Sequence, residues 1–119
     1  MSTDHVINPA AIEALREVAP GDGGKFLTEL VDIFLADTPP RLREMEQALA
    51  ARDANAMARA AHSIKGSAGN FGADRVARFA AAVETAAKTG DFAAAGQNSQ
   101  ALAEAYTAAA AVLQSLRSP

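Results

Sequence analysis

Apolar residues recur every three or four positions along most of this 119-residue chain, and glycine, proline or aspartate interrupts each series. The longest series comprises Leu27, Val31, Phe34, Thr38, Leu42, Met45 and Leu49. This spacing places side chains on one face of an α-helix. Each predicted helix therefore has an apolar face that must be buried. Because the connections between the helices are short, each helix can bury this face against its neighbours.

Capping and terminating residues predict where the helices begin and end. Asn8 as N-cap and Pro9 at the first helical position start a short amphipathic helix that ends near Ala19, before the glycine-rich segment 20–24. The markers of the later helices are Asp53 and Gly72, Asp74 and Gly90, and Asp91 and Leu116. Between the glycine-rich segment and Asp53, the long apolar series predicts one further helix.

Two adjacent prolines, Pro39 and Pro40, lie inside the longest apolar series. A proline removes a helical hydrogen bond and clashes with the preceding turn, so it kinks or ends a helix. The apolar spacing nevertheless stays in phase across both prolines. One long kinked helix is the simpler interpretation, and two helices that meet at the prolines are the alternative.

The composition favours an all-α fold, because hydrophobic residues make up 50% of the chain while aromatic residues make up 5%. Alanine, the best helix former, dominates the hydrophobic set. We expect an antiparallel up-and-down four-helix bundle with a short additional N-terminal helix, because very short turns join the long helices. Residues 1–119 are expected to form a single domain, with residues 1–7 as a flexible N-terminus.

Charge and residue usage argue against several classes of function. The formal net charge of -3 gives no basic surface for nucleic acid or for an anionic membrane, and the chain has no cysteine. Its apolar stretches are far shorter than the roughly 20 residues that span a bilayer. We therefore expect a cytoplasmic protein without nucleic-acid or membrane partners, and a monomer, because one chain can bury every apolar face.

The predicted helix that follows Asp53 carries the most unusual residues. At about 100° per residue, its core face contains Ile64, Ser67, Ala68 and Phe71, and His62 lies close to the opposite side. The residues sharing the face of His62 are Asn55, Ala58, Arg59, Lys65, Gly66 and Gly69. A glycine inside a helix costs about 0.5 to 1 kcal/mol relative to alanine. Two glycines on this exposed face therefore suggest a function.

The exposed histidine has the chemistry of a phosphoryl acceptor. A neutral imidazole is a competent nucleophile near pH 7, and Lys65, one turn away, can meet the oxygens of a phosphoryl group on the ring. The missing side chains at Gly66 and Gly69 would let a second protein bring its active site onto His62. The chain has no nucleotide-binding loop, so the partner would supply the catalytic machinery.

The run His62-Ser63-Ile64-Lys65-Gly66-Ser67-Ala68, followed by Asn70-Phe71-Gly72-Ala73, resembles the signature of the histidine phosphotransfer (HPt) domain family. Phe34-Leu35-Ala36-Asp37-Thr38-Pro39 is similar to the family's second-helix pattern, and Asp53 with Ala60-Ala61 is also typical. The resemblance extends from about residue 8 to residue 116.

The resemblance implies a bundle that carries phosphoryl groups between receiver-domain aspartates in a two-component phosphorelay. His62 would be phosphorylated and Lys65 would stabilise the phosphoryl group. The residues expected at the docking surface are Gly66, Gly69, Arg59 and Ala58. The expected partners are response-regulator receiver domains and a hybrid histidine kinase. The receiver would hold Mg²⁺, and this chain would bind no cofactor and would not be an enzyme.

Two other functions stay open at this level. A helical interaction module would bind a signalling partner without being phosphorylated, and it would bind equally well after His62 is replaced. An enzyme that transfers phosphate unaided would need a metal cluster or a nucleotide loop. His5 and His62 are far apart and lack a carboxylate arrangement, so we expect no metal site.

Overall fold

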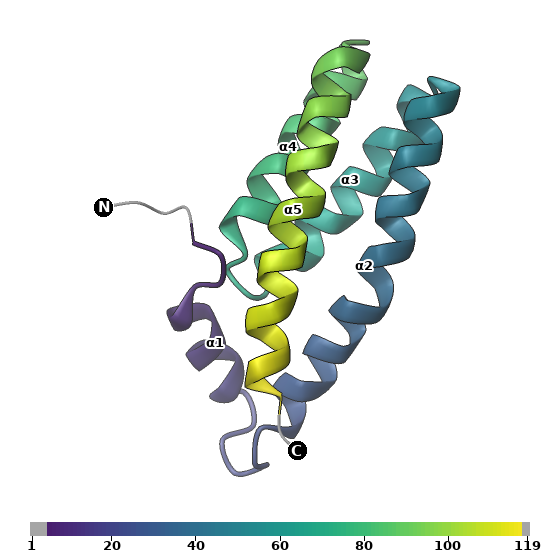
Figure 1. The fold of residues 1–119 in the computed structure, drawn as a ribbon. Helices are drawn as coiled ribbons and strands as arrows, with labels where there is room; N and C mark the ends of the chain where they lie inside the picture. The colour runs from purple at the N-terminus through teal and green to yellow at the C-terminus, as the bar shows by residue number, and fades with distance from the viewer. Residues whose placement is uncertain (1–4, 118–119) are drawn as a thin grey trace.

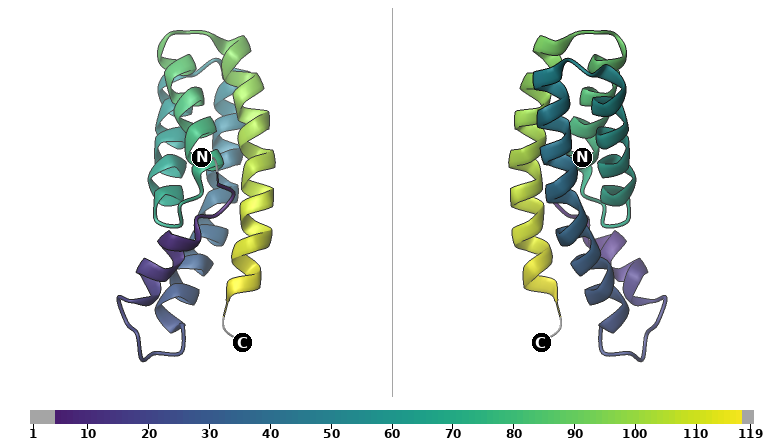
Figure 2. Two further views of the ribbon diagram at one scale, coloured as in Figure 1. Left: turned by 90° about the vertical axis from the view of Figure 1, so that its left-hand side faces the viewer. Right: turned by 90° about the vertical axis from the view of Figure 1, so that its right-hand side faces the viewer.

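The computed structural model describes residues 5–117, and these residues form five helices and no strand (Figure 1). The helices are α1 (Pro9–Arg16), α2 (Lys25–Ala51), α3 (Ala54–Gly69), α4 (Asp74–Lys88) and α5 (Phe92–Leu116). Helices α2 to α5 alternate in direction and lie side by side, while α1 covers one end (Figure 2). Each of the four contacts its two neighbours in a closed ring, and α1 contacts α2. The prediction of an all-α, up-and-down bundle is confirmed.

The predicted caps form as hydrogen bonds. The side chains of Asn8, Asp53 and Asp91 accept backbone N–H groups at the starts of α1, α3 and α5. Helix α1 is shorter than predicted, because it ends at Arg16 and not near Ala19. A residue that precedes a proline disfavours helical geometry, and Pro20 follows Ala19 directly. The chain therefore leaves the helix before the glycine-rich turn.

Helix α2 is continuous across Pro39 and Pro40, which decides against two separate helices. Pro39 has no N–H group, so the carbonyl of Leu35, four residues earlier, lacks its helical donor. The hydroxyl of Tyr106 on α5 donates to this carbonyl at 3.5 Å. The Tyr106 ring packs against Phe34 with ring centroids 5.6 Å apart, and burial raises the pKa of its hydroxyl. A side chain from a neighbouring helix thus partly replaces the missing bond.

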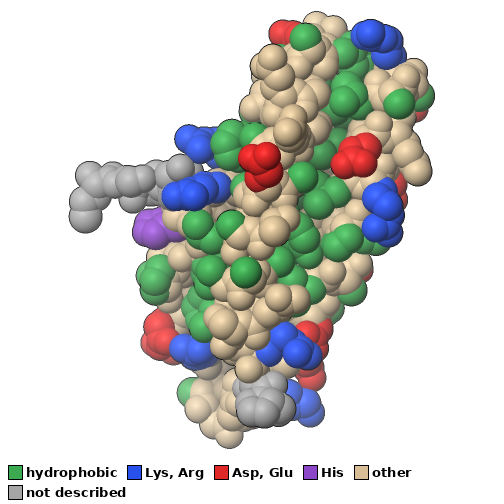
Figure 3. All heavy atoms as spheres, in the orientation of Figure 1, with side chains coloured by type: hydrophobic (Ala, Val, Ile, Leu, Met, Phe, Trp, Pro, Cys, Tyr) green, Lys and Arg blue, Asp and Glu red, His purple; other side chains and the backbone are tan. Residues whose placement is uncertain are grey.

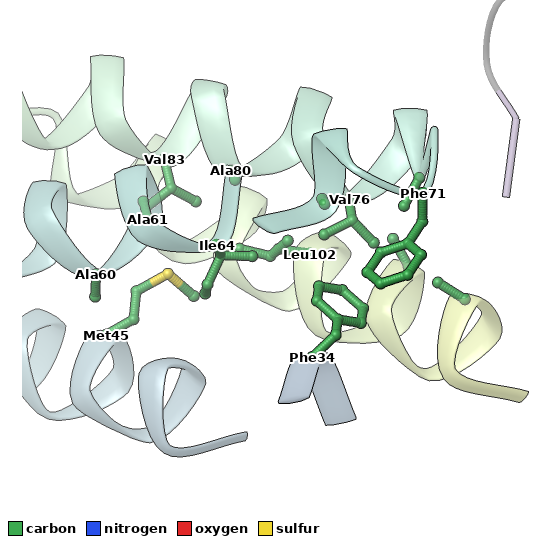
Figure 4. Packing of buried hydrophobic residues seen from close by; sticks show 14 of the residues in the cluster. Phe34, Met45, Ala60, Ala61, Ile64, Phe71, Val76, Ala80, Val83 and Leu102 are labelled. Atoms are coloured by element: carbon green, nitrogen blue, oxygen red, sulfur yellow. The ribbon is translucent and has the colours of Figure 1, made fainter. Parts of the chain in front are cut away.

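The core combines a few large side chains with many alanines (Figure 4). The rings of Phe34 and Phe71 lie 5.2 Å apart between centroids, and Ile64 of α3 lies near the middle of the core. The buried alanines of α3 and α4 include Ala58, Ala60, Ala61, Ala68, Ala80, Ala86 and Ala87. Because a methyl group is short, α3 and α4 can approach closely, and they contact each other more extensively than any other pair of helices.

The N-terminal segment is attached to the turn between α3 and α4. The N–H group of Asn8 donates to the carbonyls of Phe71 and Gly72. The carbonyl of His5 accepts the N–H group of Arg75, and His5 Nδ1 lies 2.9 Å from Asp74 Oδ2. Of the segment expected to be flexible, residues 5–7 therefore belong to a region with specific contacts, and residues 1–4 lie outside the described residues.

Charged side chains of both signs are scattered over the face that α2 and α5 present, with hydrophobic side chains between them (Figure 3). This face has no large area of a single charge. Within residues 5–117, no helix is both long and apolar enough to cross a membrane.

We predict that replacing two glycines by alanine has opposite effects on stability. Gly72 has a φ of +59°, and a Cβ atom there would clash with the Asn8 Cβ, whereas a Cβ at Gly66 meets nothing within 4 Å. Gly72→Ala should lower the free energy of unfolding by about 2 kcal/mol. Gly66→Ala should raise it by about 0.5 to 1 kcal/mol. Urea denaturation measures both, and equal effects would contradict the described turn.

Candidate functional site

His62 lies in the middle of α3, and 67% of its side chain is exposed. Ile64 and Ala68 on the same helix are buried in the core. The predicted exposure of His62 is therefore confirmed, and the helix holds the imidazole on the outer surface of the bundle. The role of His62 as a phosphorylation site stays a prediction.

A carboxylate from the neighbouring helix contacts His62. Glu84 of α4 lies with Oε2 3.2 Å from His62 Nδ1, and its side chain is 13% exposed. Lys65 Nζ donates to Glu84 Oε1 at 3.1 Å, and Lys88 Nζ donates to Glu84 Oε2 at 3.1 Å. We call His62, Lys65, Glu84 and Lys88 the Glu84 cluster. It joins a nucleophilic ring, one anion and two cations on a surface shared by α3 and α4.

The contacts of Glu84 fix its charge. Hydrogen bonds from Lys65 and Lys88, which outweigh the opposing effect of burial, lower the pKa of Glu84 from its usual 4.5 to about 2. At neutral pH Glu84 is therefore a carboxylate, which accepts hydrogen bonds and donates none.

The charge of Glu84 in turn determines which nitrogen of His62 can react. Because the carboxylate only accepts, the His62 Nδ1 that faces it must carry the proton. In the neutral ring, the lone pair then belongs to Nε2. Among residues 5–117, no hydrogen bond to His62 Nε2 is found, so this nitrogen is available as a nucleophile.

Glu84 and Lys88 were not predicted as site residues, although the sequence contains a signal for Glu84. His62 and Glu84 are equally far from Ala73 along the chain, on the two sides of the turn between α3 and α4. In an antiparallel helix pair with a short turn, residues equidistant from the turn lie side by side. Lys88 then follows from Glu84, because residues four apart on a helix are neighbours.

The structure places the predicted neighbours of His62 as follows. Lys65 lies one turn from His62, as expected, with its ammonium group on Glu84. Gly66 and Gly69 are exposed, and a Cβ at either would meet nothing within 4 Å. Arg59 is exposed and lines an open groove of about 570 Å³ between α2 and α3. These residues and His62 lie on one face of α3, where the two glycines leave open space above the helix.

Two expectations for α3 are wrong. Ala58 was predicted at the docking surface, but it is 8% exposed, because α4 lies along the side of α3 that carries Ala58 and the Glu84 contact. Ser67 was predicted in the core, but it is exposed and borders a small hollow between α2 and α3. A helical wheel gives the direction of a side chain and does not say how far the neighbouring helix extends over it.

The described residues show no group of three or more histidine, cysteine, aspartate or glutamate side chains that could hold a metal ion. The Glu84 cluster contributes only one carboxylate and one imidazole of this kind, and two ammonium groups surround the carboxylate. The expectation that the chain binds no metal stays a prediction.

The fold and this site together define a class: a helical-bundle protein that offers an accessible imidazole nucleophile and cations beside it. The family model of the Hpt domain matches residues 29–112, and the chain belongs to this family. It is accordingly a histidine phosphotransfer module of phosphorelay signalling. The resemblance recognised in the sequence is confirmed.

Two solved structures have the same fold. Histidine-containing phosphotransfer protein B (HptB) from Pseudomonas aeruginosa PAO1 is 27% identical, with a TM-score of 0.83 over 92% of this chain and 91% of that protein. Histidine-containing phosphotransfer protein MtHPt2 from Medicago truncatula is 20% identical, with a TM-score of 0.82 over 93% of this chain and 76% of that protein. Among curated protein sequences, none matches the chain.

We predict that Glu84→Gln makes stability less dependent on pH. Because the folded-state pKa of Glu84 is about 2, below the usual 4.5, its ionised form stabilises the fold above about pH 4.5, and this contribution is lost as the pH falls toward 2. The exposed ends of the lysines limit the contribution to about 1 kcal/mol. Urea denaturation at pH 7, 4.5 and 3 should show the two proteins converging in acid. A constant difference would argue against the ion pairs.

Proposed function

We propose that His62 accepts a phosphoryl group from a receiver-domain aspartate and passes it to another receiver aspartate. The lone pair of Nε2 attacks the phosphorus, the Nε2–P bond forms, and the P–O bond to the aspartate breaks. The aspartate leaves as a carboxylate, and Nδ1 keeps its proton. The observation that carries this proposal is the exposed His62 ring with its Nδ1 on Glu84.

The partner is proposed to supply the remaining chemistry. Transfer moves negative charge between two acceptors, and Lys65 and Lys88 supply cations at the carboxylate that contacts His62. We propose that a receiver domain holds Mg²⁺ and aligns the phosphorus, and that this chain is a carrier with no catalytic machinery of its own. A hybrid histidine kinase is proposed as the source of the phosphoryl group.

The docking surface is proposed to cover the exposed face of α3 around Gly66, Gly69 and Arg59. The absence of side chains at the two glycines supports this choice, because an incoming active site needs room above Nε2. We also propose a monomer, since the ring of α2 to α5 buries the apolar faces within one chain. A cytoplasmic location stays an expectation from the sequence.

The alternative, an interaction module that is never phosphorylated, explains the bundle but not the Glu84 cluster. A module that only binds needs no defined proton position on an exposed histidine. Binding a partner would also not require two cations at the same carboxylate. Replacing His62 distinguishes the two functions. An interaction module would still bind its partner, whereas a phosphotransfer protein would lose transfer.

We predict that His62→Gln abolishes phosphoryl transfer without unfolding the protein. His62 is largely exposed, so glutamine should be accommodated with a change in stability within about 0.5 kcal/mol. The test incubates each protein with phosphorylated receiver domains and follows the loss of label from the receiver. The product on the wild type should be acid-labile and fairly stable in alkali, as a phosphoramidate is. Transfer by a folded His62→Gln protein would refute the assignment.

We predict that Gly66→Arg impairs transfer while stability is kept. The arginine would stand one turn from His62 on the docking surface, and a displacement of about 1 Å can cost on the order of 10²-fold in rate. Gly66→Ala is the matched control, because a single methyl group meets no neighbour and adds little bulk to the docking surface. Transfer rates and thermal melting are measured for both. Normal transfer by Gly66→Arg would show that this glycine does not serve partner access.

A further inference from the structure

The Glu84 carboxylate has more partners than are needed to orient His62. One hydrogen bond to Nδ1 fixes the ring, yet Lys65 from α3 and Lys88 from α4 also donate to the same carboxylate, each at 3.1 Å. The two lysine side chains are 39% and 65% exposed. Ion pairs this exposed add little to stability. The two ammonium groups are therefore better explained by what happens at His62 than by the fold.

Phosphorylation of Nε2 changes which anion the two lysines prefer. A phosphoryl group carries up to two negative charges on three oxygens, whereas Glu84 carries one charge on two oxygens. Both lysines already sit at the carboxylate that contacts the ring, and lysine stems are flexible. Either ammonium group can therefore pass from Glu84 to the phosphoryl oxygens without any movement of the helices.

This inference rests on the proposed phosphorylation of His62. We propose that Glu84 and Lys88 set how firmly His62 holds its phosphoryl group: Glu84 retains Lys65 and Lys88 while the ring is unmodified, and it must give them up when Nε2 is phosphorylated. The phosphoryl group competes with Glu84 for the same cations. Glu84 thereby makes the phosphorylated histidine a better donor, and Lys88 acts with Lys65 as a second phosphoryl-binding cation.

Two effects of Glu84 oppose each other, and net charge decides between them. The Nδ1–H bond to Glu84 strengthens when the phosphorylated ring becomes cationic. The same ring, however, bears a dianionic phosphoryl group, so the modified residue has a net charge of about -1 and is repelled by the carboxylate. The loss of two ammonium contacts adds to this repulsion. Glu84 should therefore weaken the attachment of the phosphoryl group overall.

The experiment measures this attachment without a protein partner, with phosphoramidate as the phosphoryl donor. The lone pair of His62 Nε2 attacks the phosphorus, the Nε2–P bond forms, the P–N bond of phosphoramidate breaks, and ammonia leaves. At a fixed ratio of phosphoramidate to ammonia, the phosphorylated fraction at equilibrium gives the transfer constant. Phosphorus NMR measures this fraction and reports the surroundings of the phosphoryl group by its chemical shift.

Glu84→Gln should raise the transfer constant on the order of tenfold, because it removes the charge but can keep a hydrogen bond to the ring. Lys88→Met should lower the constant severalfold and shift the phosphorus resonance. It should do so in the Glu84→Gln background as well, because Lys88 acts on the phosphoryl group itself. Glu104→Gln on α5 and Lys25→Met on α2, both exposed, are the charge-matched controls and should change nothing.

An unchanged or lowered constant in a folded Glu84→Gln protein would overturn the role of Glu84. If the effect of Lys88→Met vanishes in the Glu84→Gln background, the direct role of Lys88 is overturned. If phosphoramidate cannot modify His62 in the wild-type protein, the roles of Glu84 and Lys88 are both overturned. Circular dichroism checks that each variant is folded. No receiver takes part in this experiment. If the transfer constants from phosphoramidate are as expected but the protein fails to exchange phosphoryl groups with receivers, the proposed function is refuted and this inference stands.

Discussion

The close packing of α3 against α4 is the contact on which the site depends. Alanines such as Ala61 and Ala80 are fully buried between the helices of the core, and their short side chains keep the helix axes near each other. Glu84 can then reach across to a histidine that points outward from α3. Larger residues at these alanines would move α4 away, and the carboxylate would lose the ring while the helices themselves remained.

The helices could be predicted from the sequence because their signals are local. N-caps such as Asp53 and Asp91 act within one turn, and their side chains accept the expected N–H groups. Gly72, the predicted stop, has the positive φ that favours glycine. The continuity of α2 across Pro39 depends also on Tyr106, about seventy residues away. The unbroken spacing of apolar residues predicted the continuous helix, but no residue within α2 indicates that Tyr106 would contact it.

The site could be predicted only as far as one helix determines it. His62, Lys65 and Gly66 share a motif, so their exposed face follows from helical geometry. Glu84 belongs to another helix, and its place beside His62 depends on the register across the turn at Ala73. The errors at Ala58 and Ser67 have the same origin, because the extent of a neighbouring helix is a tertiary property.

A carrier differs from a storage site in what its surroundings must do for the bound group. Cations alone would hold a phosphoryl group more firmly with every lysine added, and the group would then leave slowly. A carboxylate among the cations limits this gain, because each ammonium group that turns to the phosphoryl oxygens leaves an anion with fewer partners. With Lys65 and Lys88 in place, 13% of the Glu84 side chain is exposed, so the carboxylate depends mainly on protein groups for its hydrogen bonds. In the proposed mechanism, the arrangement would therefore balance attraction against release of the phosphoryl group at His62, whose side chain is exposed on α3.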